Sequence, residues 1–213
     1  MELNYWKHSW PLRTLSCPCD GDFVEYVVEK KVANKVIFHF GTGSHHLVGK
    51  ANAALEKPNL VFAITASRRE YSKYMDYIIS NPLAAGSYQV IFADVYTLRA
   101  RLLPRFDYVT LFHLGEFYDP KRSAYAPLND STLVDLFLGR LNRNGRILFY
   151  KFSAGGAAER TQIILRRAAE ERKIAQVDEY KSLLVYRRGP GFSLSGQSQL
   201  TPPRFLHKRR DIT

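Results

Sequence analysis

The sequence of 213 residues predicts one α/β domain, built on a doubly wound, mostly parallel sheet of seven strands with an antiparallel edge hairpin. Three observations favour this fold. From residue 24 onward, short apolar runs alternate with segments of helical periodicity. The first apolar run leads into a glycine turn, and the last two runs are joined through Lys181. The length allows one sizeable core and gives no reason to divide the chain.

Five apolar runs are expected to form the parallel strands. Each run is short and nearly continuous, which is typical of a strand that is covered on both faces. The five runs span 36–40, 59–66, 88–93, 106–114 and 146–152. The segments 174–180 and 182–187 are expected to pair with each other as the closing hairpin.

The segments between the strands carry helical signals. Apolar residues follow helical spacing over 47–55, and over 71–79 they recur at i, i+3, i+4, i+7 and i+8. A short helical stretch is expected over 97–103. The letters NDS predict the start of a helix over 131–141, and NRNG predicts its end. The last helix is expected over 157–172.

Both ends of the chain differ from this alternating part. Residues 1–21 form an aromatic segment, whose Trp6 and Trp10 either pack on the core or act as a lid or dimer contact. Residues 22–188 form the predicted domain, and 189–213 form a basic tail rich in Gly, Pro and Ser, without periodicity. The N-terminus does not resemble a secretory signal and no apolar run approaches the length of a membrane span, so a cytoplasmic protein is expected.

The charge and the cysteines limit the partners. The net charge of +11, from 31 basic and 20 acidic residues, favours an anionic partner at the basic surface and tail. A solvated basic face explains the same charge, and no RNA-binding signature is present. Cys17 and Cys19 are too few for a closed zinc site and poorly spaced for a disulfide framework, which predicts ordinary reduced thiols.

The order of the elements resembles the class I S-adenosylmethionine-dependent methyltransferases. The resemblance spans residues 22–188, and it is carried by five strand–helix units, a closing hairpin and a glycine turn after the first strand. Phe92-Ala-Asp94 matches the family's third strand, and Leu141-Asn-Arg-Asn-Gly145 matches the turn before its fifth. The resemblance implies methyl transfer from S-adenosylmethionine to an unidentified acceptor. It also implies that Thr65 or Ser67 lies near the ribose and Asp94 near the adenine.

The glycine turn has a physical rationale of its own. Gly41 and Gly43 can adopt backbone angles that are closed to other residues, and they let a ligand approach without a Cβ in the way. The helix that follows directs free N–H groups toward the same place. The residues His39, Gly41, Thr42 and Gly43 are therefore expected to line a cofactor turn.

Several family positions carry unexpected residues. His39 stands where the family has its first acid, and His45 replaces the third glycine of the turn. Thr65 or Ser67 stands in place of the acid that holds the ribose, and a hydroxyl lacks the charge of a carboxylate acceptor. We therefore expect a weakened affinity for the cofactor or a different ligand.

The ends of the first and fourth strands are expected to form the active crevice. His113 or Glu116 is the expected base for an acceptor that must lose a proton, and Tyr118 is expected to shape the acceptor pocket. His113 also has a plain interpretation, as a hydrogen-bonded residue at a strand end.

Three alternatives to methyl transfer were considered. In the first, the chain is a catalytically inactive methyltransferase-like domain that acts as a binding or regulatory module. A metal site would use the residues His39, His45, His46, His113 and Glu116, but no local spacing supports it, and no metal is predicted. A dinucleotide oxidoreductase would need the pattern G-x-G-x-x-G and a later acid, which this sequence lacks.

Overall fold

The computed structural model describes residues 3–193. Its elements, in chain order, are α1 (Cys19–Glu29), β1 (Val36–Phe40), α2 (Leu47–Ala53), β2 (Leu60–Thr65), α3 (Arg68–Ser80), the 3-10 helix η1 (Pro82–Gly86), β3 (Tyr88–Phe92), the 3-10 turns η2 (Val95–Thr97) and η3 (Ala100–Leu102), β4 (Phe106–Thr110), α4 (Asp130–Arg140), β5 (Leu141–Tyr150), α5 (Ala157–Glu170), β6 (Ile174–Tyr180) and β7 (Leu183–Arg188). No helix among these residues is long and apolar enough to cross a membrane.

The seven strands form one sheet in the order β3-β2-β1-β4-β5-β7-β6. Strands β1 to β5 run parallel, whereas β7 is antiparallel to both β5 and β6. The chain order reverses beside β1, so β1 and β4 are neighbours at the switch point of the sheet. The predicted doubly wound sheet with its antiparallel edge hairpin is confirmed.

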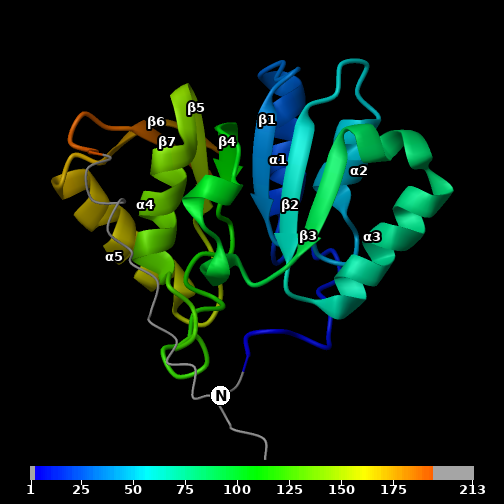
Figure 1. Ribbon diagram of the computed structural model, residues 1–213. Helices are drawn as coiled ribbons and strands as arrows, with labels where there is room; N and C mark the ends of the chain where they lie inside the picture. The colour runs from blue at the N-terminus through cyan, green and yellow to red at the C-terminus, as the bar shows by residue number, and fades with distance from the viewer. Residues whose placement is uncertain (1–2, 194–213) are drawn as a thin grey trace, which may run out of the picture.

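Two hydrophobic cores lie on opposite faces of the sheet. In Figure 1, α4 and α5 lie in front of the sheet, and α1 and α2 lie behind it. Phe38 of β1 packs in the front core, 4.2 Å from Phe137 of α4 between ring centroids. Ile37, its neighbour in the chain, packs in the rear core with Phe23 of α1. Adjacent residues of β1 thus enter different cores, which explains why this strand is a continuous apolar run.

Helix α1 was not expected from the sequence. It buries Phe23, Tyr26 and Val27 in the rear core, at the spacing of one helix face. Asp20 and Asp22 stand in its first turn, where the helix dipole favours negative charge. The helix begins at Cys19, so the predicted domain start at residue 22 falls inside it.

Three other segments differ in detail from the sequence prediction. The expected helix over 97–103 consists of the two short turns η2 and η3. Strand β4 ends at Thr110, and residues 111–117 turn away from the sheet edge. The NRNG signal lies within β5, where the pairing with β4 jumps from Phe106–Leu141 to Tyr108–Arg146. Residues 194–213 of the predicted tail lie outside the described residues.

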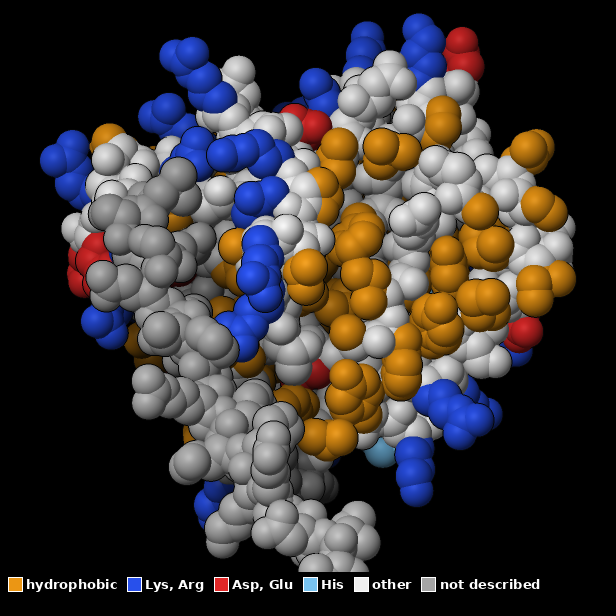
Figure 2. Space-filling view, in the orientation of Figure 1, with side chains coloured by type: hydrophobic (Ala, Val, Ile, Leu, Met, Phe, Trp, Pro, Cys, Tyr) orange, Lys and Arg blue, Asp and Glu red, His pale blue; other side chains and the backbone are white. Residues whose placement is uncertain are grey.

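No helix covers the front of β2 and β3 in Figure 1, since only η2 and η3 connect β3 to β4. Leu60 of β2 is 56% exposed, and Phe62 and Ile91 are only half-buried. Figure 2 shows hydrophobic side chains gathered on this face, with Lys and Arg beside them. The described part of the molecule therefore has an apolar area next to a basic one.

Candidate functional site

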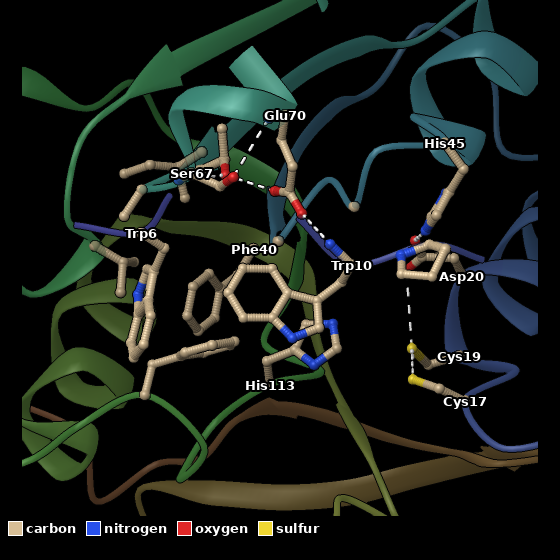
Figure 3. A pocket seen from close by; sticks show the side chains of 18 of the residues that line it. Trp6, Trp10, Cys17, Cys19, Asp20, Phe40, His45, Ser67, Glu70 and His113 are labelled. Carbon is tan, nitrogen blue, oxygen red and sulfur yellow. Dashed lines mark hydrogen bonds and ion pairs between the residues drawn. The ribbon is translucent and has the colours of Figure 1, made fainter. Parts of the chain in front are cut away.

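A cavity of about 410 Å³ lies at the carboxyl ends of the parallel strands. Its floor comes from residues after β1, β2, β3 and β4, and its cover comes from the N-terminal segment 4–13 (Figure 3). Both sides contribute large rings, among them Trp6, Trp10, Phe40 and Phe117. The cavity lies at the switch point of the sheet, where ligands of open α/β folds bind.

The glycine turn forms part of this floor. Gly41 and Gly43 have φ angles of +86° and +53°, a conformation that side chains other than glycine rarely adopt. The chain's own rings lie over both. A Cβ on Gly41 would stand 2.7 Å from His113, and a Cβ on Gly43 would stand 2.2 Å from His45. The turn itself places no Cβ between its backbone and the cavity, but the His113 and His45 imidazoles occupy the space next to the two glycines.

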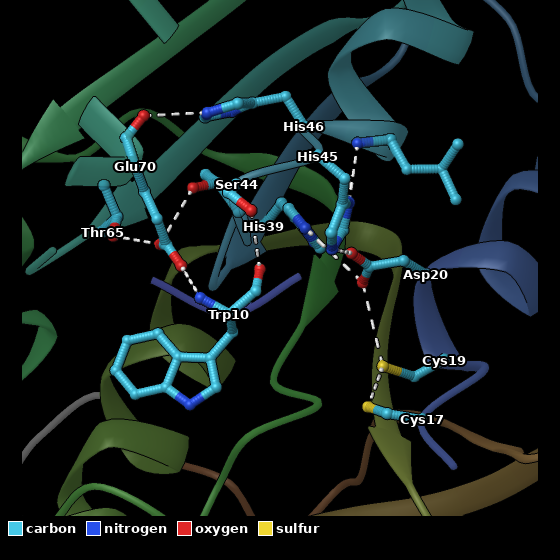
Figure 4. A network of polar contacts seen from close by, with 12 residues as sticks. Trp10, Cys17, Cys19, Asp20, His39, Ser44, His45, His46, Thr65 and Glu70 are labelled. Carbon is cyan, nitrogen blue, oxygen red and sulfur yellow. Dashed lines mark hydrogen bonds and ion pairs between the residues drawn. The ribbon is translucent and has the colours of Figure 1, made fainter. Parts of the chain in front are cut away.

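Glu70, which the sequence analysis did not select, places a carboxylate in the cavity. It lies in the first turn of α3 and is 2% exposed. Its carboxylate accepts hydrogen bonds from Thr65 Oγ1 at 2.6 Å, from the Trp10 backbone N–H at 3.0 Å and from Thr42 Oγ1 at 3.4 Å (Figure 4). Burial raises the pKa of Glu70. The signal was present in the letters SRRE, a serine cap with an acid three residues later.

The residues predicted near the ribose have partners within the chain. Thr65 lines the cavity and donates its hydroxyl proton to Glu70. Ser67 lines it too, but its hydroxyl donates to the His8 carbonyl and accepts from the Glu70 N–H at the start of α3. Thr42 is buried and does not line the cavity. The carboxylate on this wall therefore belongs to Glu70.

Asp94 is buried at the other end of the cavity and is 1% exposed. One carboxylate oxygen accepts from the Tyr96 N–H at 3.1 Å and from the Asn4 side chain at 3.5 Å. The other accepts from the Tyr125 hydroxyl. Asp94 is thus the cap of η2 and also an anchor for the N-terminal segment.

The three residues predicted at the acceptor do not share one location. His113 lines the cavity, and its Nδ1 lies 3.2 Å from Glu116 Oε2. Burial lowers the pKa of His113, but the hydrogen bond and charge of Glu116 outweigh it and raise this pKa to about 9. His113 is therefore a cation at neutral pH, and it donates to Glu116. Tyr118 packs against Tyr96 and does not line the cavity.

A polar cluster lies where β1 meets α1 (Figure 4). His39 Nδ1 forms a hydrogen bond with Thr110 Oγ1 at 2.8 Å, and its Nε2 lies 3.7 Å from Asp20 Oδ1. His45 Nε2 lies 3.7 Å from Asp20 Oδ2. Burial lowers the pKa of His39 to about 3 and that of His45 to about 4, whereas burial raises that of Asp20 to about 7. Since both imidazoles are neutral at pH 7, these contacts are not ion pairs.

The cluster does not form the metal site considered from the sequence. His46 is turned away, with its two nitrogens bonded to the Tyr88 hydroxyl and the Glu70 carbonyl. Across residues 3–193, no group of three or more His, Cys, Asp or Glu side chains is arranged to hold a metal ion.

The N-terminal segment, residues 4–13, is hereafter called the strap. The Trp6 N–H donates to the Ala66 carbonyl, the Arg68 N–H donates back to Trp6, and the Ser44 N–H donates to Trp10. The Trp6 and Trp10 rings contact each other edge to face at 5.9 Å, and both contact Phe117. The strap is therefore tied to the ends of β1 and β2 and to the segment after β4.

Comparisons with known proteins support the fold and not a closer relationship. No family model and no curated protein matches the chain. Among solved structures, a magnesium protoporphyrin IX methyltransferase from Synechocystis with bound S-adenosylmethionine has a TM-score of 0.59 at 13% identity, covering 81% of this chain and 79% of that one. A ribosomal protein methylase from Lactobacillus delbrueckii has a TM-score of 0.54 at 14% identity, covering 84% and 81%.

A precorrin 8w decarboxylase from Methanobacterium thermoautotrophicum has a TM-score of 0.53 at 10% identity, covering 86% of this chain and 96% of that one. The strand order and these likenesses define the fold as that of class I S-adenosylmethionine-dependent methyltransferases. The reaction must be argued from the site, because one fold hosts many activities.

Proposed function

We propose that the cavity binds S-adenosylmethionine and that the chain transfers its methyl group to an acceptor not yet identified. The observation that carries the proposal is the cavity of about 410 Å³ over Gly41 and Gly43, with the Glu70 carboxylate on its wall. When bound, S-adenosylmethionine supplies an electrophilic methyl group.

Glu70 is the residue that we expect to hold the ribose. Oε1 accepts one hydrogen bond, from Trp10, so it retains capacity for a hydroxyl donor. When ionised, the carboxylate forms a stronger hydrogen bond than a neutral acceptor does. Glu70 thus supplies the carboxylate that the end of β2 lacks.

His113 and the aromatic rings suit the remaining parts of the ligand. The His113 imidazolium lines the cavity and attracts a carboxylate, either of the cofactor's methionine group or of an acceptor. Trp6, Trp10 and Phe117 line the cavity and offer faces for a planar group. Asp94 Oδ2 accepts one hydrogen bond, from Tyr125, so it retains capacity for a donor of an adenine.

Binding of S-adenosylhomocysteine, measured by titration calorimetry, tests the proposal. Glu70→Gln is expected to weaken binding about tenfold, or ~1.4 kcal/mol, because a neutral amide replaces the charged acceptor. Glu159→Gln, at an exposed position of α5, is the matched control and should bind like the unaltered protein. Equal affinity of all three proteins would remove Glu70 from the site, and no binding to any of them would contradict the proposed function.

A second candidate is a non-catalytic binding module, and one observation favours it. The rings of His113 and His45 lie over both glycines, and the strap covers the sheet edge. Such a module would contact an anionic partner through its basic surface, part of which is visible in Figure 2. Saturable binding of that partner without any affinity for S-adenosylhomocysteine would favour this function over methyl transfer.

A further inference from the structure

Two free thiols face each other on the wall of the cavity. Cys17 Sγ and Cys19 Sγ are 3.4 Å apart, and both residues line the cavity (Figure 3). They are the two cysteines of the whole sequence. The proposed methyl transfer gives neither of them a role, although a thiol beside a ligand cavity is a reactive group.

The surroundings of the two thiols differ. Cys17 lies before α1 and is half-buried, whereas Cys19 is the first residue of α1 and is 1% exposed. The hydrogen bond with Cys19 lowers the pKa of Cys17 to about 6, and the same bond raises that of Cys19. Cys19 Sγ also lies 3.8 Å from Asp20 Oδ1, so its S–H group has two acceptors within reach, Cys17 Sγ and the Asp20 carboxyl.

We propose that Cys17 and Cys19 form an oxidisable dithiol, in which Cys17 reacts with a hydroperoxide and Cys19 closes a disulfide. This inference rests on the geometry of the thiols and does not depend on methyl transfer.

The chemistry has two steps. The Cys17 thiolate attacks one peroxide oxygen, the O–O bond breaks, and the leaving alkoxide or hydroxide takes a proton to become an alcohol or water. Cys17 is then a sulfenic acid. Cys19 sulfur attacks the Cys17 sulfur, the S–O bond breaks, and the departing hydroxide combines with the Cys19 proton to give water. The hydroperoxide gains two electrons, and the two thiols lose two.

Asp20 is placed to pass the Cys19 proton to the departing hydroxide during the second step. Its carboxylate is 5% exposed, and burial raises its pKa to about 7, so part of it is ionised at neutral pH and able to accept. The charged and titratable groups that act on Cys17 are Cys19, His113 and Glu116, and Tyr150 lies near the same thiols. The His113 cation favours the Cys17 thiolate, and the Glu116 anion opposes it.

The test uses the full chain, reduced, freed of reductant and analysed for metal before use. One equivalent of hydrogen peroxide should remove both thiols and give a Cys17–Cys19 disulfide within one chain, identified by peptide mass mapping. Cys19→Ser should instead accumulate a sulfenic acid on Cys17 that dimedone traps. Cys17→Ser should react several-fold more slowly, because the remaining thiol is buried and protonated.

The pH dependence distinguishes this site from an ordinary thiol. The rate of Cys17 alkylation by iodoacetamide should rise with a midpoint near pH 6 in the unaltered protein. The matched control is Leu15→Cys in a chain where Cys17 and Cys19 are serine, since Leu15 is 100% exposed. Its midpoint should lie more than two pH units higher.

Three results would overturn the proposal. They are disulfides only between chains, a Cys17 midpoint equal to that of the control, and one tightly bound metal ion per chain that protects both thiols. Far-ultraviolet circular dichroism of each variant establishes that it is folded, and the alkylation profile of the unaltered protein needs no variant at all.

Discussion

The ion pair with Glu116 determines the protonation state of His113, which lines the cavity. Their side chains are 20% and 25% exposed, and 3.2 Å separates the two charged atoms. The same ion pair raises the pKa of His113 and lowers that of Glu116. His113 is thus a hydrogen-bond donor at neutral pH, so an acceptor that needs a base must find it elsewhere or arrive already ionised.

The ion pair predicts a pH-dependent stability. The pKa of His113 in the folded protein, about 9, exceeds its ordinary value of 6.5, so its contribution is complete below pH 6.5 and is lost as pH rises through 9. Glu116→Gln should therefore lower the free energy of unfolding by about 2 kcal/mol at pH 6. At pH 10 the difference should nearly vanish. Urea unfolding at both pH values measures it.

The control for this prediction is a substitution at an exposed glutamate. Glu159→Gln should leave stability unchanged within about 0.5 kcal/mol at both pH values, because its side chain is exposed. An effect of Glu116→Gln that is equal at pH 6 and pH 10 would show that His113 is not charged by this pair.

Residue identity alone did not reveal the site's carboxylate. Thr65 lines the cavity, but Glu70 stands five positions later and returns to Thr65 only because α3 begins at Arg68. A motif at a strand end predicts which residues of the strand lie near a ligand. It does not predict which side chain of the following helix contacts them.

The strap closes the cavity without belonging to any helix or strand of the sheet. Three backbone bonds, side-chain bonds to Glu70, Ser67 and Asp94, and the rings of Trp6 and Trp10 hold it. Such a segment opens more readily than the strands it covers.

Trp6→Ala is expected to loosen the strap without loosening the sheet. The change removes ring contacts with Trp10 and Phe117 and the stacking of Arg122 at 4.4 Å. Hydrogen exchange at the amides of Trp10 and Ser44 should become about tenfold faster, whereas the β1 amides should keep their rates. Leu15→Ala, at a fully exposed side chain, should change neither. Faster exchange throughout β1 would mean that the strap is part of the core.

The elements themselves were largely predictable. Hydrophobic periodicity and apolar runs indicate which residues are buried, and they located the five parallel strands and the hairpin. Helix α1 was missed although Phe23, Tyr26 and Val27 share a face, because the segment precedes the first strand and no family motif falls on it. The strap was expected only as one of several alternatives for Trp6 and Trp10, since local patterns do not show which segment covers a sheet edge.

The whole molecule combines a methyltransferase fold with a cavity in which histidine rings lie beside the glycine turn. The sheet order places β1 beside β4, and it thereby brings Gly41 close to His113. The glycines leave the backbone open, and the ligand must share that opening with two imidazoles. Reorientation of these rings is therefore part of the binding event that we propose, since flexible side chains can move where backbone cannot.

Crystals of the chain grown with millimolar S-adenosylhomocysteine would show whether the cavity binds the cofactor. We expect the ligand in the cavity, with its ribose hydroxyls on Glu70, against the backbone of Gly41 and Gly43, and with the His113 and His45 rings displaced. An empty cavity, with both rings still over the glycines, would contradict this expectation.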